Sequence, residues 1–359
     1  MQIIQILTTV SFGDAVSNDC LAIKKLLESR GYNTSVYAEN LDKRIKDPDI
    51  RYFNKLKNVS KDDIIIYHLS TGTILNRKIK SLPGRKYVIY HNVTPPIFFV
   101  KYSGKLAKLC SKGVSEVKDL KDTFEGGCCD SQYNLDELRS YGYTCPLSVR
   151  PILIPFEDYK KEPDPEVVSR MSDGVKNILF VGRVAPNKCQ QDLISMLYAY
   201  KKMYSDPVRL ILAGNGGGME KYVARLKCYA DNLGLNADVV FTGQISFPAI
   251  LAYYSTADCF VCMSEHEGFC VPLAEAMCFD VPILAYSCCA VPGTLGGTGI
   301  LLQDKDPSVA AAYLHEILND EALRGKIVEE QRERLKDFSY ENVSKLFMEQ
   351  LESFIGGNK

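Results

Sequence analysis

Short apolar runs alternate with longer amphipathic segments along almost the whole of this 359-residue chain. The runs have the length of β-strands, and the segments between them carry apolar residues at helical spacing. Strands that alternate with helices in this way form parallel sheets covered by helices. The chain is therefore predicted to be an α/β protein. The predicted strands are 2–8, 33–38, 63–67, 86–91, 126–130, 177–182, 208–213, 239–242, 259–263 and 282–285.

A stretch rich in proline and charge divides the chain between Pro151 and Pro165. Its composition suits a linker better than a core. Because a single core seldom grows beyond about 250–300 residues, two domains are expected. We place them at 1–160 and 161–339, with an amphipathic closing helix over about 340–359 that packs back on or near the first domain. Ligands bind at the carboxyl ends of parallel strands, so the chemistry is expected in a cleft between the domains.

The composition excludes several classes of protein. With 46% hydrophobic and 24% charged residues, the chain is neither disordered nor fibrous. A net charge of −1 does not indicate a nucleic-acid partner, although positive charge is concentrated in residues 1–160. The N-terminus is typical of a first strand rather than a signal peptide, and no window is apolar enough to span a membrane. The 13 cysteines, many within apolar runs, suit a reducing cytoplasm.

The segment after the strand at 259–263 is the most informative for chemistry. A turn with Glu267 and Gly268 leads into a helix in which Pro272 is expected as the first residue. Free amides at such a helix start bind phosphate oxygens. Glu267, and Glu275 in the expected first helical turn, can accept hydrogen bonds from sugar and ribose hydroxyls. The two carboxylates also fit a solvated pair at a helix start, where acidic residues are favoured.

A second cluster of polar residues follows the strand at 177–182. Gly182 ends this strand, and Arg183 and Lys188 lie in the loop and helix start after it. Two cations at the carboxyl end of a strand are suited to neutralising a diphosphate leaving group. Either cation alone would equally fit an exposed surface charge.

Taken in order, the motifs of the second half resemble those of the retaining glycosyltransferases of family 4. The resemblance covers most of residues 175–300 and rests on Gly182-Arg183…Pro186…Lys188, Ala213-Gly-Asn-Gly216, Phe241-Thr-Gly243, Glu267-x7-Glu275 and Ala290-Val-Pro-Gly-Thr-Leu-Gly-Gly297. It implies the GT-B architecture, in which two Rossmann-like doubly wound domains face each other across a cleft. The loop from Ser11 to Asp19 resembles one in bacterial members that build cell-surface polysaccharides.

The resemblance implies roles for individual residues of the second half. Arg183 and Lys188 would bind the diphosphate of the donor, Glu275 its ribose and Glu267 its sugar. With His91, the residues Glu267, Arg183 and Lys188 are implied to be catalytic. The implied donor-binding residues are Gly182, Arg183, Lys188, Gly214, Gly243, Gln244, Ile245, Glu267, Gly268, Phe269, Cys270, Val271, Leu273 and Glu275.

The first half is implied to hold the acceptor. His91 follows an apolar run and resembles the family's active-site histidine, which touches the donor sugar or the acceptor. His68 has the same placement one strand earlier, although a histidine at a strand end is often structural. Asp14 or Ser17 would equally cap the next helix. The implied acceptor-side residues are Gly13, Asp14, Ser17, His68, His91 and Asn92.

The resemblance implies a cytoplasmic retaining hexosyltransferase that uses a nucleoside-diphosphate sugar such as a UDP-sugar or GDP-sugar. Its acceptor would be a hydroxyl of a saccharide or lipid-linked saccharide, in cell-surface polysaccharide or lipopolysaccharide biosynthesis. The mechanism would be front-face and would require no metal and no cofactor. Asp47-Pro48-Asp49 matches a D-x-D metal motif only by its letters and is predicted to be a turn.

Other interpretations of the sequence stay open. The lysines between Lys101 and Lys121 favour peripheral contact with the inner face of a membrane, or simply a solvated helix; no nucleic-acid partner is expected. The alternative functions are a GT-B nucleotide-sugar epimerase, a phosphorylase and a non-catalytic sugar-nucleotide binder. The glycines from Gly214 to Gly218 indicate a nicotinamide dehydrogenase as a further alternative, but they depart from the G-x-G-x-x-G pattern of such enzymes.

Overall fold

The computed structural model describes residues 1–357, which form two compact units. Unit 1 consists of Met1–Ile97, Lys105–Pro155 and the segment that begins at Phe338. Unit 2 consists of Phe98–Gly104 and Phe156–Asp337. No helix among the described residues is long and apolar enough to cross a bilayer.

This division differs from the predicted boundary after residue 160 in two short segments. Phe98–Gly104 and the 3-10 helix Phe156–Lys160 were assigned to the first domain, but they belong to unit 2. The reason is aromatic packing. The ring of Tyr102 lies 5.0 Å from that of Tyr222, and the ring of Tyr159 lies 5.3 Å from that of Phe247. Composition indicates a linker, whereas these side chains fix both segments to unit 2.

Unit 1 is built on a seven-stranded sheet in the order β3-β2-β1-β4-β5-β6-β7. All paired neighbours in it are parallel. The strands are β1 (Ile3–Val10), β2 (Thr34–Leu41), β3 (Ile50–Tyr52), β4 (Ile64–Leu69), β5 (Arg85–Tyr90), β6 (Gly126–Cys129) and β7 (Leu147–Val149). The α-helices are α1 (Ala15–Ser29), α2 (Leu75–Lys78), α3 (Gly104–Asp119), α4 (Gln132–Ser140) and α13 (Tyr340–Gly356).

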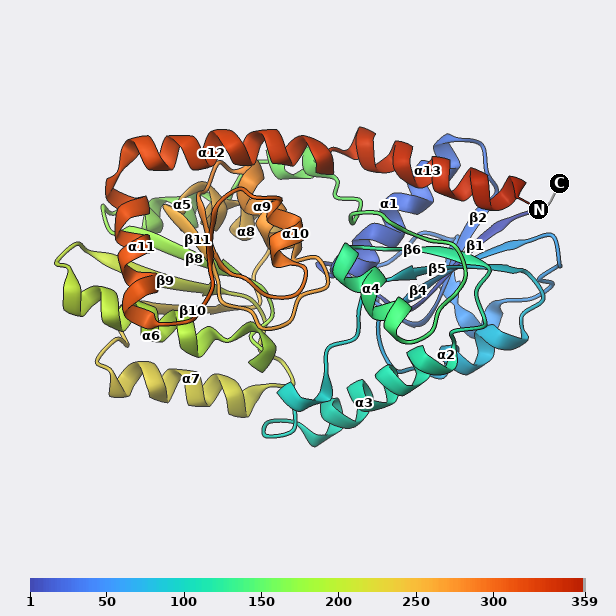
Figure 1. Cartoon of the computed structure of the whole chain (residues 1–359), viewed down its shortest axis with the longest axis horizontal. Coiled ribbons are helices and arrows are strands. Elements are labelled where there is room, and N and C mark those ends of the chain that lie inside the picture. Colours follow the sequence, from blue (N-terminus) through green and yellow to red (C-terminus); the bar gives the residue numbers. More distant parts are fainter. Residues whose placement is uncertain (358–359) are drawn as a thin grey trace. The chain divides into compact units, whose positions relative to one another are not determined.

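Helices cover both faces of this sheet (Figure 1). On one face, apolar side chains of α2, α3 and α4 pack against β4 and β5. On the other face, Ile23 and Leu27 of α1 and Phe347 and Leu351 of α13 form a second core layer. Arg85 of β5 donates hydrogen bonds to the carbonyls of Phe354 and Ile355, at 2.6 and 3.0 Å. The last helix of the chain is therefore part of unit 1.

Unit 2 contains a six-stranded parallel sheet in the order β10-β9-β8-β11-β12-β13, the order of a doubly wound fold. Its strands are β8 (Lys176–Val181), β9 (Val208–Ala213), β10 (Val239–Gly243), β11 (Cys259–Cys262), β12 (Ile283–Tyr286) and β13 (Ile300–Leu302). Its α-helices are α5 (Pro165–Met171), α6 (Gln190–Met203), α7 (Glu220–Asn232), α8 (Phe247–Ser255), α9 (Val271–Cys278), α10 (Val291–Leu295), α11 (Pro307–Asn319) and α12 (Glu321–Leu335).

The ten predicted strands are all present, with no end shifted by more than three residues. The sequence pattern did not predict three of the strands in the described residues: β3, β7 and β13. Each has three residues and lies at the edge of its sheet. At an edge, pairing with one neighbour suffices to hold a short segment, and no long apolar run is needed.

Candidate functional site

Two glycines bring the loops after β8 and β9 together. Gly182 donates its amide to the carbonyl of Ala213 at 2.9 Å, and Gly214 has a φ of +156°. A Cβ atom on Gly214 would lie only 1.9 Å from the carbonyl oxygen of Gly182. The close approach therefore requires glycine, and it leaves bare backbone at the carboxyl end of the sheet.

The two predicted diphosphate-binding cations differ in their surroundings. Arg183 is exposed and donates to the carbonyl of Gly217 at 3.1 Å. Lys188 ends the 3-10 helix Pro186–Lys188, and its Nζ lies 2.6 Å from Oε2 of Glu267. Burial opposes the charged form of Lys188, but the Glu267 carboxylate outweighs it and raises the pKa of Lys188. The lysine is thus held protonated beside the carboxylate.

The loop that carries Glu267 connects β11 to α9 and is held through its backbone. Glu267 is only 6% exposed. Its carbonyl accepts a hydrogen bond from the amide of Ala290 at 3.3 Å, and the carbonyl of Phe269 accepts one from Oγ1 of Thr294 at 2.5 Å. Burial lowers the pKa of the neighbouring His266 to about 4, so this imidazole is neutral at physiological pH. The two hydrogen bonds to the carbonyls of Glu267 and Phe269 fix the backbone of the loop around Glu267.

Helix α9 begins one residue earlier than predicted. Val271 is its first residue and Pro272 its second, and Cys270 before it has a left-handed φ of +70°. Glu275 is consequently the fifth helical residue, beyond the first turn in which it was expected. The predicted site residue Leu273 is fully buried, and its amide donates to the carbonyl of Cys270 at 3.0 Å.

The carboxylate of Glu275 accepts hydrogen bonds from two tyrosines that the sequence analysis missed. Tyr159 donates its hydroxyl to Oε1 of Glu275 at 2.5 Å, and Tyr254 donates to Oε2 at 2.7 Å. Burial raises the pKa of Glu275. Tyr159 lies 116 residues away in sequence, and Phe247 beside it follows the predicted base-binding loop. An isolated polar aromatic residue in a proline-rich segment gives no signal of such a contact.

The predicted base-binding residues Gly243, Gln244 and Ile245 lie where β10 ends. Gly243 has a left-handed φ of +67°, and both Gly243 and Gln244 are exposed. The amide of Gly214 donates to Oγ1 of Thr242 at 3.3 Å, which ties this strand end to the glycine loop after β9. In unit 2, these strand ends and the start of α9 all belong to the carboxyl edge of the parallel sheet.

In unit 1, a chain of hydrogen bonds links four adjacent strands. Nδ1 of His91, directly after β5, lies 2.8 Å from the carboxylate of Asp130, which follows β6. Nε2 of His91 lies 2.9 Å from Nδ1 of His68 in β4. Nε2 of His68 lies 3.0 Å from Oε1 of Gln5 in β1. The predicted site residues His68 and His91 are therefore brought together.

The protons of this chain follow from the surroundings. Burial opposes the charged form of His91, but Asp130 beside it raises the pKa of His91. Burial lowers the pKa of His68. These directions are consistent with a protonated His91 that donates to Asp130 and to a neutral His68, which in turn donates to Gln5. The side chain of His91 is 1% exposed, and both its ring nitrogens have partners.

Beneath the histidines lies an ion pair that no sequence pattern predicted. Arg150 and Asp19 are both fully buried and form two hydrogen bonds, at 2.8 and 2.6 Å. Asp19 also accepts the amide of Leu153 at 2.8 Å. Burial acts to raise the pKa of Asp19, but the charge and hydrogen bonds of Arg150 outweigh burial. The pKa of Asp19 is therefore lowered. The partners are 131 residues apart, which explains why the loop that ends at Asp19 gave no indication of the pair.

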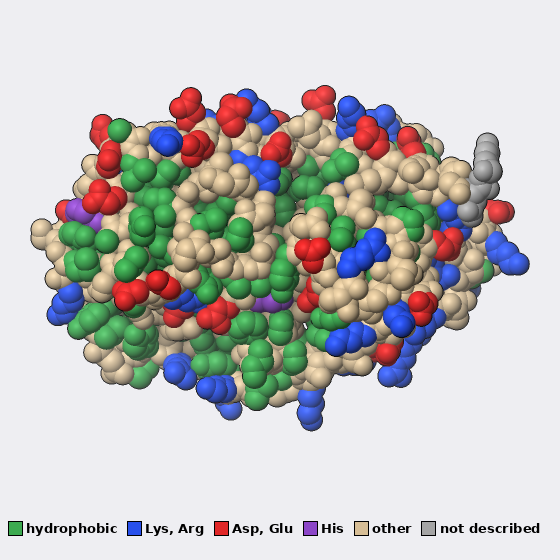
Figure 2. All heavy atoms as spheres, in the orientation of Figure 1, with side chains coloured by type: hydrophobic (Ala, Val, Ile, Leu, Met, Phe, Trp, Pro, Cys, Tyr) green, Lys and Arg blue, Asp and Glu red, His purple; other side chains and the backbone are tan. Residues whose placement is uncertain are grey.

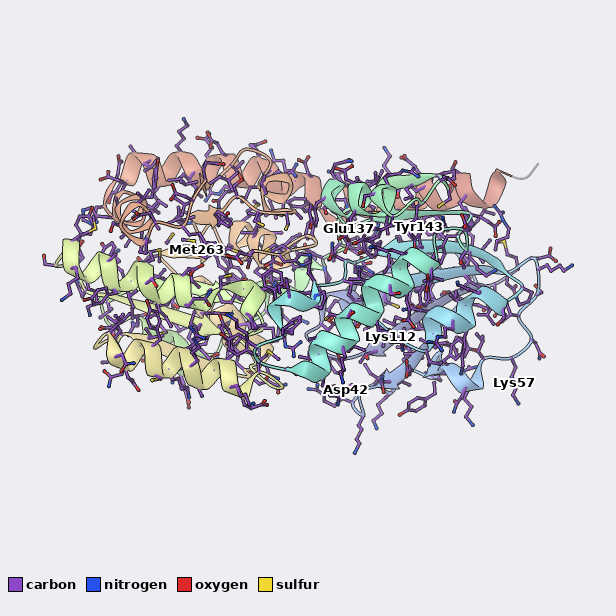
Figure 3. All side chains as sticks on the ribbon, turned by 60° about the horizontal axis from the view of Figure 1, so that its bottom comes forward. Asp42, Lys57, Lys112, Glu137, Tyr143 and Met263 are labelled. Atoms are coloured by element: carbon purple, nitrogen blue, oxygen red, sulfur yellow. The ribbon has the colours of Figure 1, made fainter. Side chains whose placement is uncertain are left out.

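The remaining predicted acceptor-side residues have local structural partners. Asp14 is the N-cap of α1, and its Oδ2 accepts the amide and the hydroxyl of Ser17, at 2.9 and 2.7 Å. Gly13 precedes this cap with a φ of +76°. Asn92 donates from Nδ2 to Asn134 at 2.8 Å and to Glu137 at 3.2 Å, and Figure 3 shows Glu137 on α4. The capping alternative for Asp14 is thus what the structure shows.

Three groups of side chains in residues 1–357 have the atoms to hold a metal ion: Asp19 with His68 and His91, Cys262 with Glu267 and Cys270, and Cys189 with Asp192 and Glu265. In the first, Arg150 already neutralises Asp19, and in the second Lys188 pairs with Glu267. The D-x-D segment forms a turn, in which Oδ1 of Asp47 accepts the amide of Asp49 at 2.8 Å. Asp47 also pairs with Lys24 at 2.9 Å.

Comparison with known proteins finds glycosyltransferases that match the second half of the chain. Residues 166–334 match the family model described as "Glycosyl transferases group 1". A D-inositol 3-phosphate glycosyltransferase of Corynebacterium urealyticum is 28% identical over 182 residues, which are 48% of this chain and 42% of that protein. The alpha-monoglucosyldiacylglycerol synthase of Streptococcus pneumoniae is 30% identical over 169 residues, 45% of this chain and 37% of that protein. The matched region thus spans less than half of the length of these relatives.

A solved structure agrees with the fold over the whole chain. Sucrose-phosphate synthase from Thermosynechococcus elongatus superimposes with a TM-score of 0.76 at 18% identity, covering 100% of both chains. At this identity the likeness concerns the fold alone. Together with the two parallel sheets, it shows the GT-B architecture. Residues 166–334 of this chain are thus a group 1 glycosyl transferase domain within a GT-B fold.

Proposed function

We propose that this protein is a glycosyltransferase that moves a sugar from a nucleoside-diphosphate sugar to an acceptor hydroxyl, with retention of the anomeric configuration. The observation that carries the proposal is the 2.6 Å pair between Lys188, after β8, and Glu267, on the loop that leads into the helix with Glu275. In the proposed roles, this pair joins a cation for phosphate to a carboxylate for the sugar, and the helix after Glu267 supplies a carboxylate for the ribose.

Charge stabilisation would drive the reaction. As the glycosidic bond breaks, negative charge builds on the departing diphosphate, and Arg183, Lys188 and the positive end of helix α9 stabilise it. In a front-face reaction, the departing phosphate oxygen takes the proton of the acceptor hydroxyl, so no strong protein base is needed. Because these groups supply the positive charge, the proposed reaction needs no divalent metal.

The acceptor is proposed to be a saccharide or a lipid-linked saccharide, and the protein to act in the cytoplasm or at the inner face of a membrane. One of the relatives is named for a diacylglycerol product. Helix α3 carries exposed lysines, Lys112 among them (Figure 3), and Ile97 shortly before it is 72% exposed. Where Figure 1 draws α3, Figure 2 shows Lys and Arg side chains beside hydrophobic ones. Such a mixture is attracted to anionic lipid.

Donor binding can be tested by thermal unfolding in EDTA with a panel of UDP-, GDP-, ADP- and dTDP-sugars and NADH. A ligand that binds the native state raises the unfolding midpoint by mass action. We expect one nucleotide family to raise the midpoint of the wild type and to have a much smaller effect on Arg183→Ala. The anomeric configuration of the transferred sugar, read by NMR, then tests retention. Stabilisation by NADH alone would contradict the proposal.

The ribose assignment of Glu275 has its own test. A carboxylate that accepts a ribose hydroxyl should make the wild type prefer the ribonucleotide over its 2′-deoxy analogue by about tenfold or more, since a hydrogen bond to a charged group contributes about 1.5–3 kcal/mol. Glu275→Gln should weaken the ribonucleotide and lose most of this preference. Calorimetric titration of both nucleotides against both proteins measures it.

Glu265→Gln serves as the control for this test, because Glu265 lies in the loop before α9 and pairs with Lys305. It should keep the preference for the ribonucleotide. A preference that survives in Glu275→Gln would remove Glu275 from the ribose site.

A further inference from the structure

Two adjacent cysteines point toward one spot beside the loop that carries Glu267. Cys288 and Cys289 lie between β12 and α10, and their sulfur atoms are 3.3 Å apart. Side chains of neighbouring residues in extended backbone point in opposite directions. Here Cys289 has a left-handed φ of +52°, which breaks this alternation. Both side chains are partly exposed, so solutes can reach them.

Both thiols share one oxygen atom. The Sγ atoms of Cys288 and Cys289 lie 3.0 and 3.5 Å from the carbonyl oxygen of Glu265. Nearby, Lys305 pairs with the carboxylates of Glu265 and Asp192, at 2.8 and 2.9 Å. Two carboxylates against one ammonium leave a local charge of about −1, which favours the approach of a cation.

The separation of the sulfur atoms distinguishes between two uses of such a pair. In a disulfide, the sulfurs are about 2.05 Å apart and the Cα atoms at least about 4.4 Å apart, whereas adjacent residues have Cα atoms about 3.8 Å apart. Two sulfurs bound tetrahedrally to one zinc ion at about 2.3 Å lie about 3.8 Å from each other. The observed 3.3 Å is closer to the second geometry. The pair is better arranged to share an ion than to bond covalently.

We propose that Cys288 and Cys289 form a chelating site for one thiophilic divalent cation of the Zn²⁺ and Cd²⁺ class. On binding, each thiol loses its proton to solvent and forms one metal–sulfur bond, with no change in oxidation state. The carbonyl oxygen of Glu265, already directed at both sulfurs, is the third ligand, and water completes the coordination. The site is separate from the proposed reaction, which needs no metal.

Cadmium titration of the reduced, full-length protein tests the proposal, because cadmium–thiolate bonds give an ultraviolet charge-transfer band. We expect Cys288→Ser and Cys289→Ser each to weaken one binding event by about tenfold or more, since one thiolate cannot chelate. The matched control is Cys228→Ser, at an exposed thiol on α7, which should titrate as the wild type does. Unchanged titration of either Cys288→Ser or Cys289→Ser overturns the proposal.

A second measurement uses only the wild type and so does not depend on the folding of a variant. Alkylation by iodoacetamide, followed by peptide mass spectrometry, reports on each thiol. Cadmium should slow the alkylation of the peptide with Cys288 and Cys289 by about tenfold or more. This effect is expected when the cadmium concentration is well above the dissociation constant of the site. Equal slowing, or none, at Cys288–Cys289 and at Cys228 contradicts the site.

Discussion

Replacing Lys188 with alanine should lower kcat/KM for the donor by about a thousandfold, the effect of removing one charge-stabilising donor from an active site. The substitution removes a cation proposed to face the diphosphate, and it leaves Glu267, which is 6% exposed, without its partner. Most of the loss should appear in kcat, because the charge on the leaving group grows in the transition state. Steady-state kinetics with the donor found by thermal screening measures the split.

The control for this prediction is Lys201→Ala. Lys201 is a residue of α6 that forms an ion pair with Asp238 at 2.6 Å, so the substitution also removes a lysine–carboxylate contact in unit 2. Its kcat/KM should stay within about twofold of the wild type, as expected for a partly exposed pair that is not assigned to the donor site. If Lys188→Ala behaved like Lys201→Ala, Lys188 would not take part in the reaction.

The largest expected effect on stability is in unit 1. Arg150→Met should lower the free energy of unfolding by about 3–5 kcal/mol, because it leaves the buried carboxylate of Asp19 without a counter-charge. Guanidinium unfolding followed by circular dichroism measures the change, and hydrogen exchange in β1 and β4 assigns it to unit 1. Arg51→Met is the control, because its pair with Asp49 is about half exposed and contributes about 1 kcal/mol or less.

The double variant Asp19→Asn with Arg150→Met separates loss of the pair from loss of packing. With both charges gone, it should be less destabilised than the sum of the two single variants, since each single variant leaves one buried charge unpaired and the double variant leaves neither. A single variant Arg150→Met with the stability of the wild type would mean that solvent reaches Asp19. Additive effects would mean that the two side chains act independently.

What the sequence predicts and what it misses follow from the range of the interactions. Strands at the centre of each sheet carry their own signal, because both faces are buried and the run is apolar along its whole length. Glu267 and Lys188 were found through motifs, each defined by residues close together in the chain. The motifs did not show that these two side chains form an ion pair, since 79 residues separate them.

Partners far apart in sequence were the main omission. Tyr159 and Tyr254 hold Glu275, and Asp130 holds His91, yet each of these three comes from a different strand–helix unit than the residue it contacts. Asp130 had a signal that was available, a charged residue that closes an apolar strand, as His91 does. Tyr159 had none, because its role depends on how the segment after Pro155 folds onto unit 2.

The path of the chain has a consequence for synthesis on the ribosome. Unit 1 starts with the first residue, but one layer of its core is supplied by α13, at the end of the chain. Unit 2 has all of its segments once Asp337 has emerged. The nascent chain can thus complete its second unit before its first, and until α13 packs, one apolar face of β1, β4 and β5 is covered only in part, by α1. Emergence of α13, rather than of the first 160 residues, closes that core.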